Sequence, residues 1–331
     1  MKTRCVSVTL TLLAAWFFSS CEKVIEFRQG ETEPCVVMIS KPGADSTVTV
    51  KMSYSRFFLD KHNFASVDNA ALSLDVNGVV YSSINLDSGY YRFPVSVHEG
   101  DSLALTATVP NYKHLLRAKT YIPRKSSFEV MEMEMDTTQR FYHSCEVFYR
   151  LRIRLKDLQK KGLYSIRVYT YDQLRGRSYY WDTTSRDYFY METEDMFVVQ
   201  PSDVMDLFDR IGDGDVNTKY GRSFYLDASS IADNEHDITV QFQNNIMFED
   251  DSFNYGDIPV FVEIEALSRD LFNYEISALP SDDYDDGFIS LFSEPVQVSC
   301  NVKGGIGVFG GYVISNHRVR EFRFENFRND Y

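Results

Sequence analysis

Apolar and polar residues alternate with a period of two along most of the chain, which is the pattern of half-buried β-strands. The alternation is clearest over residues 72–76, 103–109 and 151–155. The first of these runs ends at Asn77-Gly78, a dipeptide that favours a tight hairpin turn. Many short strands joined by turns are typical of a β-sandwich or a barrel.

Helical spacing of apolar residues occurs in two segments. Ser202 is placed to cap a short helix that ends at Gly212, and Ser268 is placed to cap a second helix that ends before Pro280. Because these helices do not alternate regularly with strands, the pattern does not fit a doubly wound parallel sheet. The predicted fold class is mostly β, with one or two short helices.

A change in composition predicts two β domains. An N-terminal immunoglobulin- or transthyretin-like β-sandwich is expected over residues 35–125, up to the basic, proline-containing segment 122–127. A larger, aromatic-rich β-sandwich or barrel-like domain that holds the helices is expected over residues 126–331. Residues 21–34 are rich in charge and are interpreted as a tether before the first domain.

The first 21 residues have the features of a bacterial lipoprotein signal, with residues 1–20 as the signal peptide. Lys2 and Arg4 precede an apolar run over residues 6–18 that is too short to span a bilayer stably. Small residues then lead to Cys21, before which a lipoprotein signal peptidase would cleave. Two or three acyl chains on Cys21 would anchor the protein durably. The alternative is an ordinary secretory signal followed by an incidental cysteine.

Charge and cysteine content limit the partners. The formal net charge is −14, and it becomes more negative when Lys2 and Arg4 leave with the signal. An acidic exterior repels nucleic acid and anionic lipid headgroups, so we expect no nucleic-acid partner and contact with a membrane only through acyl chains. Cys35, Cys145 and Cys300 allow at most one disulfide and have no zinc-site spacing.

Gly305-x-Gly307-x-x-Gly310 has the spacing of a dinucleotide-binding turn. Such a turn needs a helix directly after it, because the N–H groups at the helix start hold the pyrophosphate. The residues that follow, Tyr312-Val313-Ile314-Ser315, do not start a helix. We therefore interpret the segment as a glycine-rich strand past which another backbone runs closely, and we assign no nucleotide or other cofactor.

Other motifs resemble catalytic or metal sites without completing them. Gly100-Asp101-Ser102-Leu103 and Asp233-x-x-His236 spell the two ends of a serine-hydrolase motif, but an alternating strand follows Ser102 where a helix is needed. We interpret the first motif as a turn into a strand. The acidic runs 213–217 and 282–286 lack the ligand order of a calcium loop, and the six histidines are scattered. No catalytic or metal-binding residue is assigned.

Aromatic residues cluster between positions 164 and 190. Rings on a strand most often pack in a core or across neighbouring strands. Adjacent aromatic residues, however, must point to both faces of a strand, and outward rings can stack on sugars or contact peptides. The resulting candidate surface for a peptide or glycan ligand consists of Tyr179, Tyr180, Trp181, Tyr188 and Tyr190.

Several short motifs follow one another in a set order from Cys21 almost to the end of the chain. They are NAALSLDVNG at residues 69–78, GDSLAL at 100–105, GLYSI at 162–166, FSEPV at 292–296 and NVKGGIGVFGGY at 301–312. In this order they resemble the Bacteroidota lipoproteins grouped as domain of unknown function 4249. The glycine-rich tail is the most specific part of the likeness. The chain departs from the family at residues 38–41, where an asparagine-glycine pair is usual.

The resemblance implies an outer-membrane lipoprotein whose relatives are frequently encoded beside TonB-dependent transporters. It carries over no catalytic residue, only the acylated Cys21. The leading hypothesis is a non-catalytic, lipid-anchored β protein that presents a surface to a transporter or its cargo. The alternatives are a structural or adhesive envelope protein, and a hydrolase with an unrecognised pair of carboxylates. The sequence leaves open which face of the membrane the protein occupies.

Overall fold

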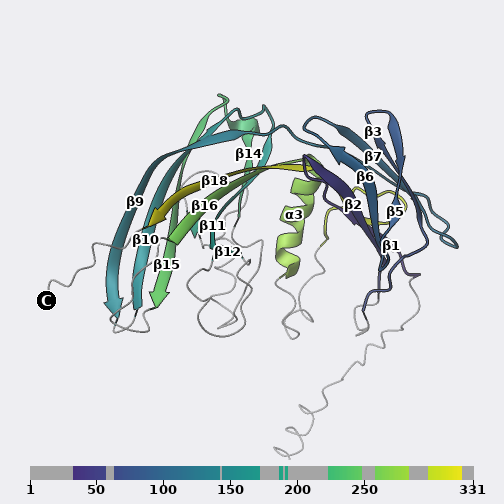
Figure 1. Ribbon diagram of the computed structural model, residues 1–331, viewed down its shortest axis with the longest axis horizontal. Helices are drawn as coiled ribbons and strands as arrows, with labels where there is room; N and C mark the ends of the chain where they lie inside the picture. Colours follow the sequence, from purple (N-terminus) through teal and green to yellow (C-terminus); the bar gives the residue numbers. More distant parts are fainter. Residues whose placement is uncertain are drawn as a thin grey trace, which may run out of the picture. The chain divides into compact units, whose positions relative to one another are not determined.

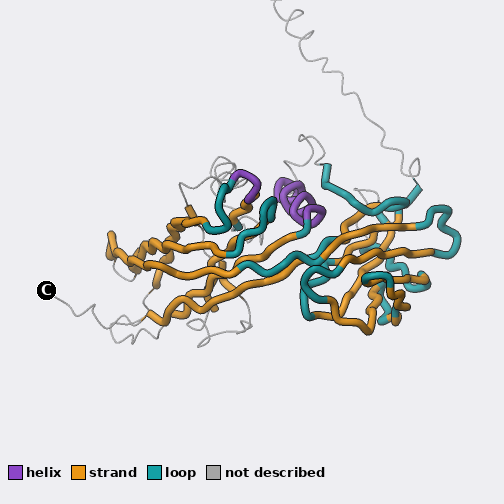
Figure 2. The backbone as a smooth tube through the Cα atoms, turned by 90° about the horizontal axis from the view of Figure 1, so that it is seen from above, coloured by secondary structure: helices purple, strands orange, loops and turns teal. Residues whose placement is uncertain are grey.

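The computed structural model describes residues 33–56, 63–141, 144–171, 186–188, 191–192, 223–247, 258–282 and 297–322. These residues form four β-sheets, one α-helix and one short 3-10 helix, so the prediction of a mostly β, sandwich-like fold is confirmed (Figures 1 and 2). In these ranges no helix has the length and apolar character needed to cross a membrane.

Two sheets enclose the first core. Their strands are β1 (Val36–Ser40), β2 (Ser46–Tyr54), β3 (Ala71–Val76), β4 (Val79–Ser82), β5 (Ile84–Asn85), β6 (Tyr90–Val97), β7 (Ser102–Thr108), β8 (Leu116–Tyr121) and β17 (Ile306–Phe309). One sheet has the order β17-β1-β2-β6-β5 and the other the order β4-β3-β7-β8. The inward residues of both sheets form one apolar cluster, because side chains along each strand alternate between core and surface.

Two predicted turns of this sandwich are confirmed. Asn77 and Gly78 both have positive φ, at 53° and 89°, and connect β3 to β4 as a tight hairpin. Gly100, with φ of 85°, leads into β7, which begins at Ser102. The motif that spells a hydrolase nucleophile is therefore a turn into a strand. The Ser102 backbone N–H donates to Asn77 Oδ1 at 2.9 Å, which joins the two turns.

The edge strand β17 comes from the far end of the chain and pairs in parallel with β1. A Cβ atom added at Gly305 would lie 2.5 Å from the carbonyl oxygen of Val36, and one added at Gly307 would overlap that of Met38. The segment is thus a glycine-rich strand beside a close backbone, as predicted, and a strand rather than a helix follows it. Phe309 of β17 is fully buried in the first core. The predicted domain boundary after residue 125 stays a prediction.

The other two sheets enclose a second core. Their strands are β9 (Ser127–Phe141), β10 (Ser144–Lys156), β11 (Leu163–Tyr171), β12 (Arg186–Tyr188), β13 (Met191–Glu192), β14 (Phe224–Asp227), β15 (His236–Met247), β16 (Ile258–Leu267) and β18 (Tyr312–Phe322). The orders are β13-β15-β10-β9 and β12-β11-β16-β18, and β14 pairs with β11. Figure 1 shows β9, β10 and β15 side by side as long strands. Ile153, Val240 and Ile264 belong to the shared cluster, so the two sheets pack face to face.

Helix α3 (Arg269–Asp282) begins directly after Ser268, as predicted. The Ser268 hydroxyl accepts a hydrogen bond from the Leu271 backbone N–H at 3.4 Å. The prediction that this helix ends before Pro280 is wrong, because the helix continues to Asp282. The φ angle of proline is compatible with a helix, and the disturbance that its ring and its missing N–H cause falls in the last turn, where few residues follow. The helix predicted after Ser202 lies outside the described residues.

Candidate functional site

The residues predicted from the sequence as functional lie mostly outside the described part of the chain. This holds for Cys21, Tyr179, Tyr180, Trp181 and Tyr190. Tyr188 lies in β12, where its backbone pairs with Tyr169, but its side chain is not described. The aromatic surface therefore stays a prediction. Cys35 and Cys300 are exposed and take part in no disulfide among the described residues. Among the described residues no group of acidic, histidine or cysteine side chains is arranged to hold a metal ion.

The outward face of β10 carries a row of cations. The core-facing residues Leu151, Ile153 and Leu155 are at most 1% exposed. Because side chains alternate along a strand, the residues between and beside them point away from the core. These residues are Arg150, Arg152, Arg154 and Lys156.

A bulge in the neighbouring strand places acidic residues beside this row. Glu132 pairs with Arg152 and Val130 pairs with Ile153, so Met131 is an extra residue in β9. One extra residue reverses which face the following side chains occupy. Glu129 before the bulge and Glu132 after it therefore share the outward face, as does Glu134.

Asp237 of β15 lies on the other side of the cation row. The Arg154 guanidinium donates to both Asp237 oxygens, at 2.6 and 2.9 Å, and Arg152 donates to one of them at 3.1 Å. The hydrogen bonds from Arg154 lower the pKa of Asp237 to about 2. Asp237 is therefore ionised at neutral pH and has no proton to donate as a general acid.

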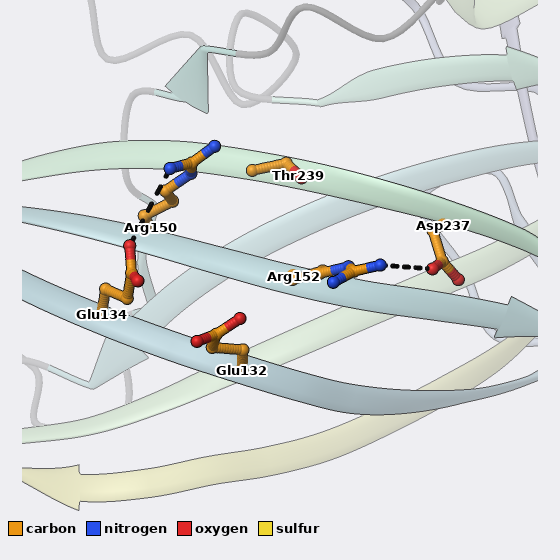
Figure 3. A pocket seen from close by; sticks show the side chains of 6 residues that line it. All are labelled: Glu132, Glu134, Arg150, Arg152, Asp237 and Thr239. Atoms are coloured by element: carbon orange, nitrogen blue, oxygen red, sulfur yellow. Dashed lines mark hydrogen bonds and ion pairs between the residues drawn. The ribbon is translucent and has the colours of Figure 1, made fainter.

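A hollow of about 370 Å³ lies on this surface, lined by Glu132, Glu134, Arg150, Arg152, Asp237 and Thr239. We call these six residues the charged face (Figure 3). Arg150 and Glu134 are 61% and 60% exposed, and their charged atoms lie 3.9 Å apart. Such exposed ion pairs contribute little to stability. Each residue can therefore leave its partner within the chain and pair with an opposite charge on a binding partner. The charged face can thus bind a surface that carries both signs of charge.

A second polar cluster is buried on the sheet face that α3 covers. Arg167 of β11 is 6% exposed, and its Nε donates to Ser223 Oγ at 3.0 Å. Its other nitrogens lie 2.5 Å from Glu265 Oε2 and 3.7 Å from Glu263 Oε1, both on β16. The helix adds Glu275, whose Oε1 lies 3.0 Å from Lys41 Nζ. The cluster joins the second core to the loop after β1.

The buried cluster has the geometry of a structural ion network. Burial by itself would lower the pKa of Arg167, but the carboxylate of Glu265, with further contributions from Glu275 and Glu263, raises it instead. Arg167 therefore stays charged and compensates the buried acids around it. The Tyr225 hydroxyl donates to Glu275 Oε2 at 3.4 Å, which ties the helix to β14.

Neither cluster was identified from the sequence. The alternating basic run Arg150-Leu151-Arg152-Ile153-Arg154 is visible there, but its acidic partners depend on a bulge and on a strand more than 80 residues away. For the buried cluster, the sequence shows only that Glu263 and Glu265 lie within an otherwise apolar run over residues 260–267. Their burial depends on what covers that face.

The family model described as "Domain of unknown function (DUF4249)" matches residues 22–318 of the chain. The match agrees with the resemblance inferred from the ordered motifs. No curated protein matches the chain.

Two solved structures show weak similarity. The β-glucuronidase of Parabacteroides merdae is 11% identical, with a TM-score of 0.21, over 71% of this chain and 24% of that enzyme. The major pilin subunit of Bacillus cereus is 11% identical, with a TM-score of 0.19, over 71% of this chain and 64% of the pilin. The chain thus spans less than two thirds of either protein, and neither similarity supports a functional argument.

Proposed function

The chain belongs to the DUF4249 family, a family of unknown function, and on this premise we propose a lipid-anchored, non-catalytic protein of the outer membrane that assists a TonB-dependent uptake system. The observation that carries the proposal is the charged face. It is a hollow lined by exposed ion pairs on the outward face of a sheet.

Two physical arguments favour binding by the charged face over catalysis. Charges of both signs on an open surface orient a complementary partner and speed its encounter, more than they raise affinity. The acids of the charged face that form ion pairs do so with arginines, and Asp237 is held ionised, which suits recognition better than proton transfer. An acylated Cys21 would confine this surface near the membrane and raise its effective concentration for a membrane partner.

If Cys21 carries the lipid anchor, removing this cysteine should release the protein from the membrane. Replacing Cys21 by alanine should abolish labelling by a palmitate analogue and move the protein from the membrane fraction to the soluble fraction, because acylation provides the durable attachment. Metabolic labelling and fractionation measure both effects. The matched variant Cys35→Ala, which removes an exposed thiol, should behave like the native protein. An unlabelled native protein, or a Cys21→Ala variant that stays in the membrane, would refute the anchor.

If the charged face binds the transporter, reversing its charge pattern should reduce binding of that partner. Swapping one ion pair, with Glu134→Arg and Arg150→Glu together, keeps the net charge and the cross-strand pair but reverses the surface pattern. Crosslinking followed by affinity purification from outer membranes should recover a transporter with the native protein and about tenfold less of it with the swapped variant.

A control for this experiment removes charge elsewhere. Arg117→Gln with Lys119→Gln alters two exposed cations on β8 and should leave recovery unchanged. Equal recovery of the transporter by the swapped variant, or recovery of no membrane protein at all, would contradict the proposed function.

An exposed edge favours the structural or adhesive role as a second candidate. Strand β4 pairs only with β3 among the described strands, and it carries neither charge nor proline. Val79 and Val80 on this edge are 54% and 65% exposed. Unprotected edges accept an extra strand from a partner. In the same crosslinking experiment, this role predicts recovery of envelope proteins or further copies of the chain, independent of the Glu134–Arg150 swap.

A further inference from the structure

A second hollow, of about 260 Å³, lies where the end of β8, the turn between β10 and β11, and the start of α3 come together. Its lining includes the buried apolar residues Leu163 and Leu267. Its exposed lining consists of three cations and one aromatic ring. We call Lys160, Lys161, Arg269 and Tyr121 the cationic pocket.

The charge of the cationic pocket is opposite to that of the protein. The chain has a formal net charge of −14, yet none of the described residues that line this hollow is acidic. None of the acidic side chains in the described part forms an ion pair with Lys160, Lys161 or Arg269. Like charges gathered without a counter-charge repel one another, and a bound anion relieves this repulsion.

Hydrogen bonds hold the turn that presents the two lysines. The Gly162 N–H donates to the Gln159 carbonyl at 2.7 Å, and the Gln159 N–H donates to the Tyr164 hydroxyl at 2.9 Å. A Cβ atom at position 162 would overlap the Tyr164 hydroxyl, so glycine is needed there. Lys161 has a φ of 68°. Since the turn is formed before a ligand arrives, binding loses little conformational entropy.

The third cation, Arg269, comes from a different segment of the chain than the two lysines. Arg269 is the first residue of α3, and Ser268 before it accepts a hydrogen bond from the Gly311 N–H at 3.0 Å. The Ser268 N–H in turn donates to the Gly311 carbonyl at 2.8 Å. These bonds fix the backbone at Arg269 against the segment that precedes β18. A planar guanidinium at a fixed backbone position suits two-point binding of an oxyanion.

We propose that the cationic pocket binds a sugar-sized ligand that carries a phosphate or carboxylate group. Lys160, Lys161 and Arg269 hold the oxyanion, and the ring of Tyr121, which is 45% exposed, contacts the sugar face. The volume is below the range of about 300–1,000 Å³ that is usual for drug-sized ligands, which favours one sugar unit. This site is separate from the charged face and does not depend on its role.

Calorimetric titration of the full-length protein at low salt tests the site with four probes: glucose 6-phosphate, glucuronic acid, glucose and inorganic phosphate. We expect at least one anionic sugar to bind and glucose not to bind. The double variant Lys160→Gln/Lys161→Asn should bind that sugar about tenfold more weakly, since two of the three cations are lost. Asparagine is chosen at position 161 because it tolerates positive φ.

The matched control is Arg117→Gln with Lys303→Gln, which removes two exposed cations that lie outside the hollow. It should bind as the native protein does. The stronger of the two anionic sugars identifies the oxyanion as phosphate or carboxylate. Three results would overturn the proposal: no binding of either sugar at about 10 mM, equal binding by the pocket variant, or inorganic phosphate binding as tightly as the sugars.

Discussion

Replacing Gly307 by alanine is expected to lower the free energy of unfolding by about 4 kcal/mol, which is a large part of the roughly 5–15 kcal/mol that stabilises an ordinary domain. Gly307 has a φ of 124°, a backbone conformation that residues with a Cβ rarely adopt. Its Cβ would also overlap the carbonyl oxygen of Met38, the residue paired with it across β1 and β17. The substitution therefore forces β17 away from β1 and exposes Phe309, which is fully buried.

Denaturant unfolding of the native and variant proteins measures this effect. Ile306→Ala on the same strand is the matched control, because that side chain is 43% exposed, and its cost should stay below about 1 kcal/mol. A Gly307→Ala protein as stable as the control would show that the contact between β17 and β1 does not hold the sandwich together.

Replacing Arg167 by methionine is expected to cost about 3–5 kcal/mol of stability, since it leaves buried carboxylates without their cation. Glu263 and Glu265 are 1% and 8% exposed, and both pair with this one guanidinium. Lys41 Nζ lies 3.0 Å from the third acid of the cluster, Glu275.

The same change on the exposed face provides the control. Arg152→Met removes an arginine that also contacts a carboxylate, at 3.1 Å, but is 50% exposed, so its cost should stay within about 1 kcal/mol. Adding Glu263→Gln and Glu265→Gln to Arg167→Met should restore part of the lost stability. Equal costs for the two arginine variants would mean that the buried cluster does not act as an ion network. Chemical unfolding of the native protein and of these variants measures the costs and decides between these outcomes.

Local patterns were sufficient to predict the strands and turns. The alternation over residues 72–76 and 103–109, the Asn77-Gly78 hairpin and the cap at Ser268 are all observed. Each depends on residues close together in the chain, so neighbouring positions carry the information. The end of α3 was predicted too early, because Pro280 was interpreted as lying beyond the helix, whereas it lies within the last turn.

Candidate binding surfaces could be predicted only in part. The cations of β10 follow from the alternation, whereas the acids of the charged face are placed by the bulge at Met131 and by the pairing with β15. The cationic pocket depends on three segments, at residues 121–123, 159–164 and 266–269, that no sequence spacing connects. Contacts between such distant segments arise from packing, which leaves no local pattern.

The order of residues is enough to show that the chain builds strands with two unlike faces, at which positions the tight turns lie, that the surface is acidic, and to which family the chain belongs. What covers each face of a strand depends on how the strands and the helix pack together. By period alone, Glu263 and Glu265 are outward residues, but α3 and Arg167 enclose them. Likewise Gly307 is bound to β1 although more than 260 residues separate the paired strands. The physical reason is that alternation specifies a difference between two faces of a strand, whereas the partner of each face is selected by long-range packing.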